Sequence, residues 1–132
     1  MANEAVLVYE THQPIQMTVD NGTGIEKGTL LTLSDPMTAA AVTVSQAATA
    51  GIAHSEKIAN DGNTKLAVYR GGIFKLVASG AITVGTAFMF TNSNKVVAAT
   101  INDEHLAGMA LETATDGETF LGELNPQHIN VA

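Results

Sequence analysis

The stretch Thr64–Val77, TKLAVYRGGIFKLV, decides how the rest of the chain is arranged. Leu66 and Val68 alternate with less apolar neighbours, and a second apolar run, Ile73–Val77, follows Gly71-Gly72. Two glycines between two such runs are typical of a β-hairpin, because glycine adopts positive φ at no steric cost. We therefore predict strand, tight turn and strand, in a hairpin that divides the chain into two halves.

On both sides of this hairpin, turn sequences separate short apolar runs. Ile15–Val19 alternates apolar and polar residues, as a half-buried strand does, and Asp20–Gly24 supplies turn residues after it. Apolar residues at helical spacing never persist for more than one or two turns. The sequence therefore predicts a mostly β fold with little helix.

The second half of the chain repeats motifs of the first. Gly28–Leu33 (GTLLTL) aligns with Gly85–Phe90 (GTAFMF) at an offset of 85 − 28 = 57 residues. The AGIA motif at Ala50–Ala53 aligns with AGMA at Ala107–Ala110 at the same offset, since 108 − 51 = 57. The DGNT turn that begins at Asp61 is echoed by DGET with two residues deleted. We interpret these matches as two pseudo-duplicated β units.

A unit of this size cannot bury its apolar face alone, so the two units are expected to close on each other as a small barrel or sandwich. A chain of 132 residues is about the size of one domain. We predict an N-terminal arm at residues 1–13 and a single β domain at residues 14–132.

The arm contains one apolar run, formed by Val6, Leu7, Val8 and Tyr9. Two interpretations stay open. The arm is a frayed terminus, since chain ends are often unordered, or its apolar run adds a strand to a sheet edge of another subunit.

Composition limits the class of function. The chain has 6 Lys and Arg against 13 Asp and Glu, a net charge of −7, so it is expected to repel nucleic acid. It has no cysteine for disulfides, thiolate metal sites or nucleophiles. The N-terminal residues lack a basic region and have an apolar run of only four residues, Val6–Tyr9, so we do not expect them to be a signal peptide. No run approaches the roughly 20 apolar residues of a membrane span. We expect a soluble protein with no nucleic-acid or membrane partner.

No residue pattern predicts catalysis, a cofactor or a metal. The four histidines, His12, His54, His105 and His128, lie far apart in sequence and lack metal-ligand spacing. The two DG turns lack the ladder of oxygen ligands of a calcium loop. We expect a protein that is not an enzyme.

Tyr69, Arg70 and Phe74 are the most distinctive cluster. Core packing explains Phe74 well. Aromatic residues with an arginine are also enriched at protein interfaces, so the cluster is our candidate subunit contact.

These residues also carry a resemblance. The AGIA motif, the turn after it, and Leu66–Phe74 (LAVYRGGIF) are similar in order to lambda-type head decoration proteins. The wider layout, from Ile15 to Leu124, resembles the small phage capsid cement proteins of the DUF2190 type.

The resemblance implies a non-enzymatic virion protein, made in the host cytoplasm, that binds the outside of an icosahedral phage head. In such proteins a homotrimer binds the major capsid protein and stabilises the expanded shell. The N-terminal arm commonly contributes to the shell contact, which here makes Val6, Leu7, Val8 and Tyr9 the candidates. This chain differs from the lambda-type pattern in its apolar arm and its longer second unit.

Two alternatives remain. The first is a duplicated-hairpin β carrier or ligand-binding domain, for which Lys95 near a hairpin tip is the one lysine to consider. The second is another virion or shell subunit, such as a fibre component.

Overall fold

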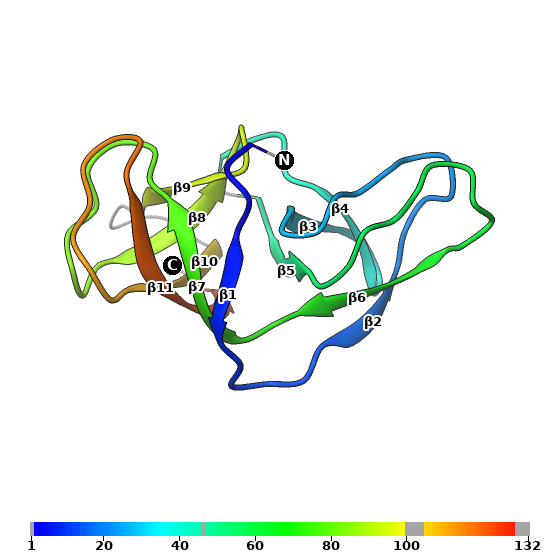
Figure 1. The fold of residues 1–132 in the computed structure, drawn as a ribbon, viewed down its shortest axis with the longest axis horizontal. Coiled ribbons are helices and arrows are strands. Elements are labelled where there is room, and N and C mark those ends of the chain that lie inside the picture. Colours follow the sequence, from blue (N-terminus) through cyan, green and yellow to red (C-terminus); the bar gives the residue numbers. More distant parts are fainter. Residues whose placement is uncertain (1, 46, 100–104, 129–132) are drawn as a thin grey trace.

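The computed structural model describes residues 2–45, 47–99 and 105–128, and these form strands, turns and extended loops (Figure 1). No helix with the length and apolar character of a membrane span occurs in this part of the chain. The strands, in chain order, are β1 (Val6–Tyr9), β2 (Ile15–Thr18), β3 (Leu30–Asp35), β4 (Thr38–Ala41), β5 (Thr49–Ala53), β6 (Lys65–Tyr69), β7 (Gly72–Val77), β8 (Ala87–Thr91), β9 (Lys95–Ala98), β10 (His105–Ala110) and β11 (Thr119–His128).

Strands β2 to β6 form the first unit, a closed barrel in the order β2-β4-β3-β5-β6. It closes through a parallel pair between β2 and β4, at Thr18 and Thr38. Met17, Leu31 and Val68 belong to the buried cluster that fills it. This core is aliphatic, because all four phenylalanines of the chain lie in the other unit.

Strands β7 to β11 form the second unit, and β1 adds to its edge in a sheet of order β1-β7-β11-β10-β8-β9. A parallel bridge from Ala78 to Val96 brings the end of β7 back to β9, which repeats the β2–β4 closure of the first unit. Its buried cluster contains Phe74, Phe88, Phe90 and Phe120. The predicted class, mostly β with a small barrel, is confirmed, but the barrel is closed by strands of the first unit alone and not by the two units together, as we expected.

The duplication is confirmed in backbone detail. The bridge between Ile25 and Lys57 recurs 57 residues later between Ile82 and Ala114. The Gly28 amide donates to the Ala53 carbonyl at 3.0 Å, and the Gly85 amide donates to the Ala110 carbonyl at 2.8 Å. Both glycines have φ of 84°, a left-handed conformation that favours glycine. These backbone requirements explain why the Gly-Thr motif occurs twice.

The predicted central hairpin is wrong. Thr64–Val77 does contain two strands, β6 and β7, but they do not pair with each other. β6 lies between β2 and β5, whereas β7 lies between β1 and β11. Each unit closes on itself, so the strands on either side of Gly71-Gly72 find their partners in different units. Gly71-Gly72 is therefore the connection between the units, a role that Figure 1 makes visible where the chain passes from β6 to β7.

The two units meet at a contact that we call the seam. Leu30, Ile52 and Tyr69 of the first unit join Phe74 and Phe90 of the second in one buried cluster. The seam places an outer face of the first barrel against the second unit, so the units form one body.

Asn94, in the turn between β8 and β9, links the seam through hydrogen bonds. Its Oδ1 accepts from the Leu30 amide at 2.7 Å. Its Nδ2 donates to the carbonyls of Gly28 at 3.0 Å and Asn3 at 2.8 Å. One side chain of the second unit therefore satisfies backbone groups of the first unit and of the N-terminal segment.

Candidate functional site

Strand β1 presents the most exposed apolar strand surface of the N-terminal segment. Val6 pairs with Lys75, Leu7 with Phe74 and Tyr9 with Ile73, and the register shifts between Leu7 and Tyr9. Leu7 packs against the core, while 46% of Val6, 41% of Val8 and 62% of Tyr9 are exposed. β1 is the edge of its sheet, so its outer backbone groups have no strand partner within the described residues. All four arm candidates thus lie on one edge strand.

The segment before β1 is attached to both units. The Ala5 amide donates to the Gly28 carbonyl at 3.1 Å, and the Asn3 side chain donates to the Ser93 carbonyl at 2.9 Å. Ala5 is buried in the main cluster. In this conformation β1 adds to a sheet of its own chain rather than to that of another subunit. The division into an arm at 1–13 and a domain at 14–132 stays a prediction.

Tyr69 and Phe74 lie inside the molecule. Their ring centroids are 5.4 Å apart at a steep angle, and 8% of Tyr69 and 1% of Phe74 are exposed. Burial, with a smaller contribution from the nearby Glu10 charge, raises the pKa of Tyr69. The interface role of these two aromatic residues stays untested, and their position offers almost no surface to a partner.

Arg70 is half-buried beside them and is used within the chain. Its guanidinium donates to the carbonyls of Thr49 at 3.1 Å and Ala50 at 2.9 Å. The cluster Tyr69–Arg70–Phe74 therefore holds the connection between the units against β5. Its role as a subunit contact also stays a prediction.

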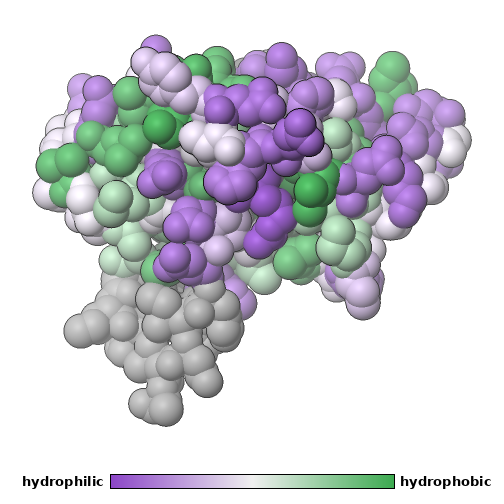
Figure 2. All heavy atoms as spheres, turned by 90° about the horizontal axis from the view of Figure 1, so that it is seen from below, coloured by the Kyte–Doolittle hydropathy of each residue, from purple (hydrophilic) through white to green (hydrophobic). Residues whose placement is uncertain are grey.

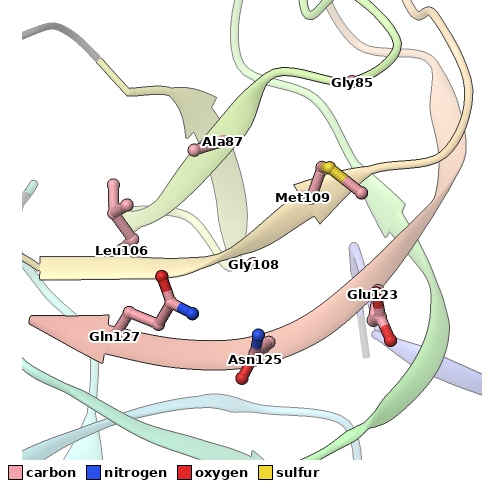
Figure 3. A pocket seen from close by; sticks show the side chains of 8 residues that line it. All are labelled: Gly85, Ala87, Leu106, Gly108, Met109, Glu123, Asn125 and Gln127. Carbon is pink, nitrogen blue, oxygen red and sulfur yellow. The ribbon is translucent and has the colours of Figure 1, made fainter.

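A second surface feature is a hollow of about 250 Å³ on the outer face of the second unit. Ala87 of β8 and Met109 of β10 border it on one side, and Glu123, Asn125 and Gln127 of β11 on the other (Figure 3). Gly85 and Gly108 form part of its wall, so the wall is low there. Met109 is 43% exposed. The hollow combines an apolar wall with carboxylate and amide groups.

Lys57 is a buried cation that we did not predict from the sequence. Its ammonium donates to the carbonyls of Asn21 at 3.1 Å and Ile58 at 2.8 Å, and to the Asp61 carboxylate at 2.8 Å. The hydrogen bond from Lys57 is the largest of the effects that lower the pKa of Asp61. These contacts join the two long loops of the first unit. Lys57 is therefore a structural residue. Its position four residues before Asp61 of the DG turn was the one feature of the sequence that could have indicated this ion pair.

In the described part of the chain, no group of three or more His, Cys, Asp or Glu could hold a metal ion. The backbone register of β10 and β11 places His105 opposite His128, a pairing that sequence spacing did not suggest.

Lys95, the carrier candidate, begins β9. The tip beside it is attached to the first unit through Asn94, whereas a carrier lysine needs a projecting tip. The structure therefore does not favour the carrier alternative.

Hydrophobic residues are scattered over the face seen from below in Figure 2, where they form several separate groups among hydrophilic ones. Hydrophobic residues scattered in this way are normal on a protein surface and do not by themselves mark a binding site.

Comparison with protein families and solved structures supplies a context for these surfaces. A family model described as phage cement protein matches residues 9–124. A search of curated proteins found no significant match.

A solved structure, the N base of the head fiber gp8.5 of bacteriophage phi29, has a similar fold. The TM-score is 0.57 at 13% sequence identity, and the alignment covers 89% of this chain and 98% of that one. At this identity the likeness concerns the fold alone.

Proposed function

Because the chain belongs to the phage cement protein family and is a structural protein of the virion, we propose that it binds the outer surface of an icosahedral phage head and stabilises the expanded shell. The family match over residues 9–124 carries this proposal. The partner is the major capsid protein, and the protein acts as a homotrimer without catalytic activity. It is made in the host cytoplasm and functions on the virion.

The outer edge of β1 is the surface that we assign to the shell. An edge strand offers backbone donors and acceptors to another chain, and alternate side chains add specificity. Val6 and Val8 lie on this edge with Tyr9 at its end, and all three are substantially exposed. The segment before β1 is bonded to both units, so the edge is held in place before binding.

Many copies of a weak contact suffice for this function. A trimer that engages three equivalent sites gains affinity through effective concentration, without new contacts. A small protein with few aromatic residues and scattered surface patches is therefore adequate as a shell stabiliser.

Sedimentation of the purified protein with expanded empty heads tests the proposal. Burial of one valine side chain contributes about 1.5–3 kcal/mol, so Val8→Asp is expected to weaken head binding by about tenfold or more. Ile58→Asp is the matched control, because Ile58 is 63% exposed in a loop of the first unit. Its binding should equal that of the wild type.

Failure of the wild-type protein to bind the expanded heads of its own phage would refute the proposal. Binding that does not protect the heads against heat would refute the stabilising role alone. Equal loss with Val8→Asp and Ile58→Asp would refute the assignment of the contact to β1.

A second candidate function is the base of a head fibre, favoured by the fold likeness to the phi29 fiber base over 98% of that chain. A fibre base holds a projecting domain on the head. Electron microscopy of decorated heads distinguishes the two functions. A cement protein gives only low protrusions on the head, whereas a fibre base carries fibres that project from it.

A further inference from the structure

The two units are internal repeats, so their equivalent faces can be compared. One face is buried in the first unit, and the equivalent face of the second unit is open. In the first unit, the outer face that includes Leu30 and Ile52 is buried at the seam, with 1% and 0% exposed. The equivalent positions in the second unit, 57 residues later, are Ala87 and Met109. Met109 is 43% exposed, and both residues border the hollow in Figure 3.

The glycine before each of the equivalent strands β3 and β8 differs in the same way, since one is covered and the other is open. A Cβ added to Gly28 would meet the side chain of Glu4 and the backbone of Ala5. A Cβ added to Gly85 would meet nothing within 4 Å. The covered face of the first unit is therefore uncovered in the second.

The matching partner surface is open as well. At the seam, Asn94 of the β8–β9 turn, with φ of 57°, covers the start of β3 together with Glu4 and Ala5 of the N-terminal segment. Its equivalent in the first unit is Met37, in the β3–β4 turn, which has a similar left-handed φ of 49°. Met37 is 53% exposed. The Val19 amide donates to the Thr64 carbonyl, and the Ala78 amide donates to the Glu118 carbonyl in the same way. When these two bonds are matched, Phe74, which is 1% exposed at the seam, corresponds to Ile15, which is 40% exposed.

The seam is thus a contact between two different faces, and each chain carries one unused copy of both. A cyclic homo-oligomer of three or more subunits also requires two different complementary patches on every subunit. We propose that the hollow beside Ala87 and Met109 binds the β3–β4 turn of a second copy of this chain, with Met37 placed as Asn94 is at the seam.

The chemistry of the two patches fits such a contact. Met37 would enter the hollow where Gly85 and Ala87 form its low wall, next to the thioether of Met109. Methionine suits this position because its side chain adapts to irregular gaps. Head-to-tail repetition of this contact builds the ring. The inference rests on the homotrimer of the proposed function and assigns its interface.

Thiol trapping tests the interface, because the natural chain contains no cysteine. Met37→Cys and Ala87→Cys are prepared as separate variants, mixed and oxidised mildly, both in solution and on expanded heads. The mixture is expected to give a covalent dimer at least tenfold more abundant than in either variant alone. Ile58→Cys mixed with Ala87→Cys is the control, since Ile58 is at least as exposed as Met37.

Three outcomes decide the question. A dimer specific to the mixture supports the head-to-tail contact. Trapping no greater than in the Ile58 control, in solution and on heads, overturns it, and so does a dominant dimer of Met37→Cys with itself. Head binding is scored separately, so heads that bind both variants without trapping reject this interface and leave the proposed function standing. Trapping without head binding supports this interface and rejects the proposed function.

Discussion

Replacement of Asn94 by glycine should weaken the seam more than any other change in the β8–β9 turn. Asn94 has φ of 57°, and glycine adopts this conformation without strain, so the variant tests the side chain and not the backbone. The side chain makes three hydrogen bonds, to Leu30, Gly28 and Asn3, of 2.7–3.0 Å.

The expected loss follows from those bonds. Each contributes about 0.5–1.5 kcal/mol to stability, and the buried Leu30 amide loses its acceptor. We expect Asn94→Gly to lower the free energy of unfolding by about 3 kcal/mol. For a chain of this length, that corresponds to a fall in Tm of about 10 °C.

Urea and thermal unfolding, followed by far-ultraviolet circular dichroism, measure the effect. Ser93→Gly is the matched control, because Ser93 lies in the same turn with φ of 60° and contributes its backbone carbonyl to Asn3. Its stability should stay within about 0.5 kcal/mol of the wild type. A loss below about 1 kcal/mol for Asn94→Gly, or an equal loss for Ser93→Gly, would refute the assignment of the seam to the Asn94 side chain.

Further predictions concern two glycines, one carboxylate and the N-terminal segment. Gly51→Ala and Gly108→Ala should each cost about 3 kcal/mol or more in urea unfolding, because the added Cβ overlaps a carbonyl oxygen of the next strand, whereas Gly117→Ala, with open space around it, should cost only about 1–2 kcal/mol. The lowered pKa of Asp61 means that its stabilising effect is complete above the usual value of 3.8 and is lost as pH falls through the lower folded value. Wild type and Asp61→Asn should therefore converge in stability at strongly acid pH, and a constant gap between them would contradict this. Deletion of residues 2–9 should lower Tm clearly, since Ala5 and β1 pack on the core, and an unchanged Tm would show a dispensable arm.

The repeat was predictable because it depends on local backbone chemistry. Gly28 and Gly85 both need positive φ at the entry to a strand, and the turns at Gly62 and Gly117 share φ of 82°. Such requirements leave the same residue type at the same offset. Composition and the absence of helical periodicity were similarly enough for the fold class.

The pairing of strands was not predictable in the same way. Gly71-Gly72 satisfies the local pattern of a hairpin turn, but pairing depends on which faces each strand can bury. β6 and β7 each complete a different unit, and this long-range closure outweighs proximity in sequence. Both strands of Thr64–Val77 were correctly predicted. Only the prediction that they pair with each other is wrong.

The candidate surface was predictable in part. An apolar run at Val6–Tyr9 indicates a strand, and the structure contains one. The three bonds of the Asn94 side chain and the bond from Lys57 to Asn21 join residues that are 36 or more positions apart, and no local pattern encodes them. The sequence Asn92-Ser93-Asn94 predicts a tight turn, and the backbone forms one. The pattern does not predict which groups the Asn94 side chain binds.

The chain has two tyrosines and no tryptophan, so its intrinsic fluorescence comes from Tyr9 and Tyr69 alone. The first is 62% exposed on β1, and the second is 8% exposed at the seam. A dissolved quencher should therefore dim Tyr9 and spare Tyr69. Without any added label, one optical signal separates occupancy of the β1 edge, which we propose to contact the shell, from opening of the seam between the two units.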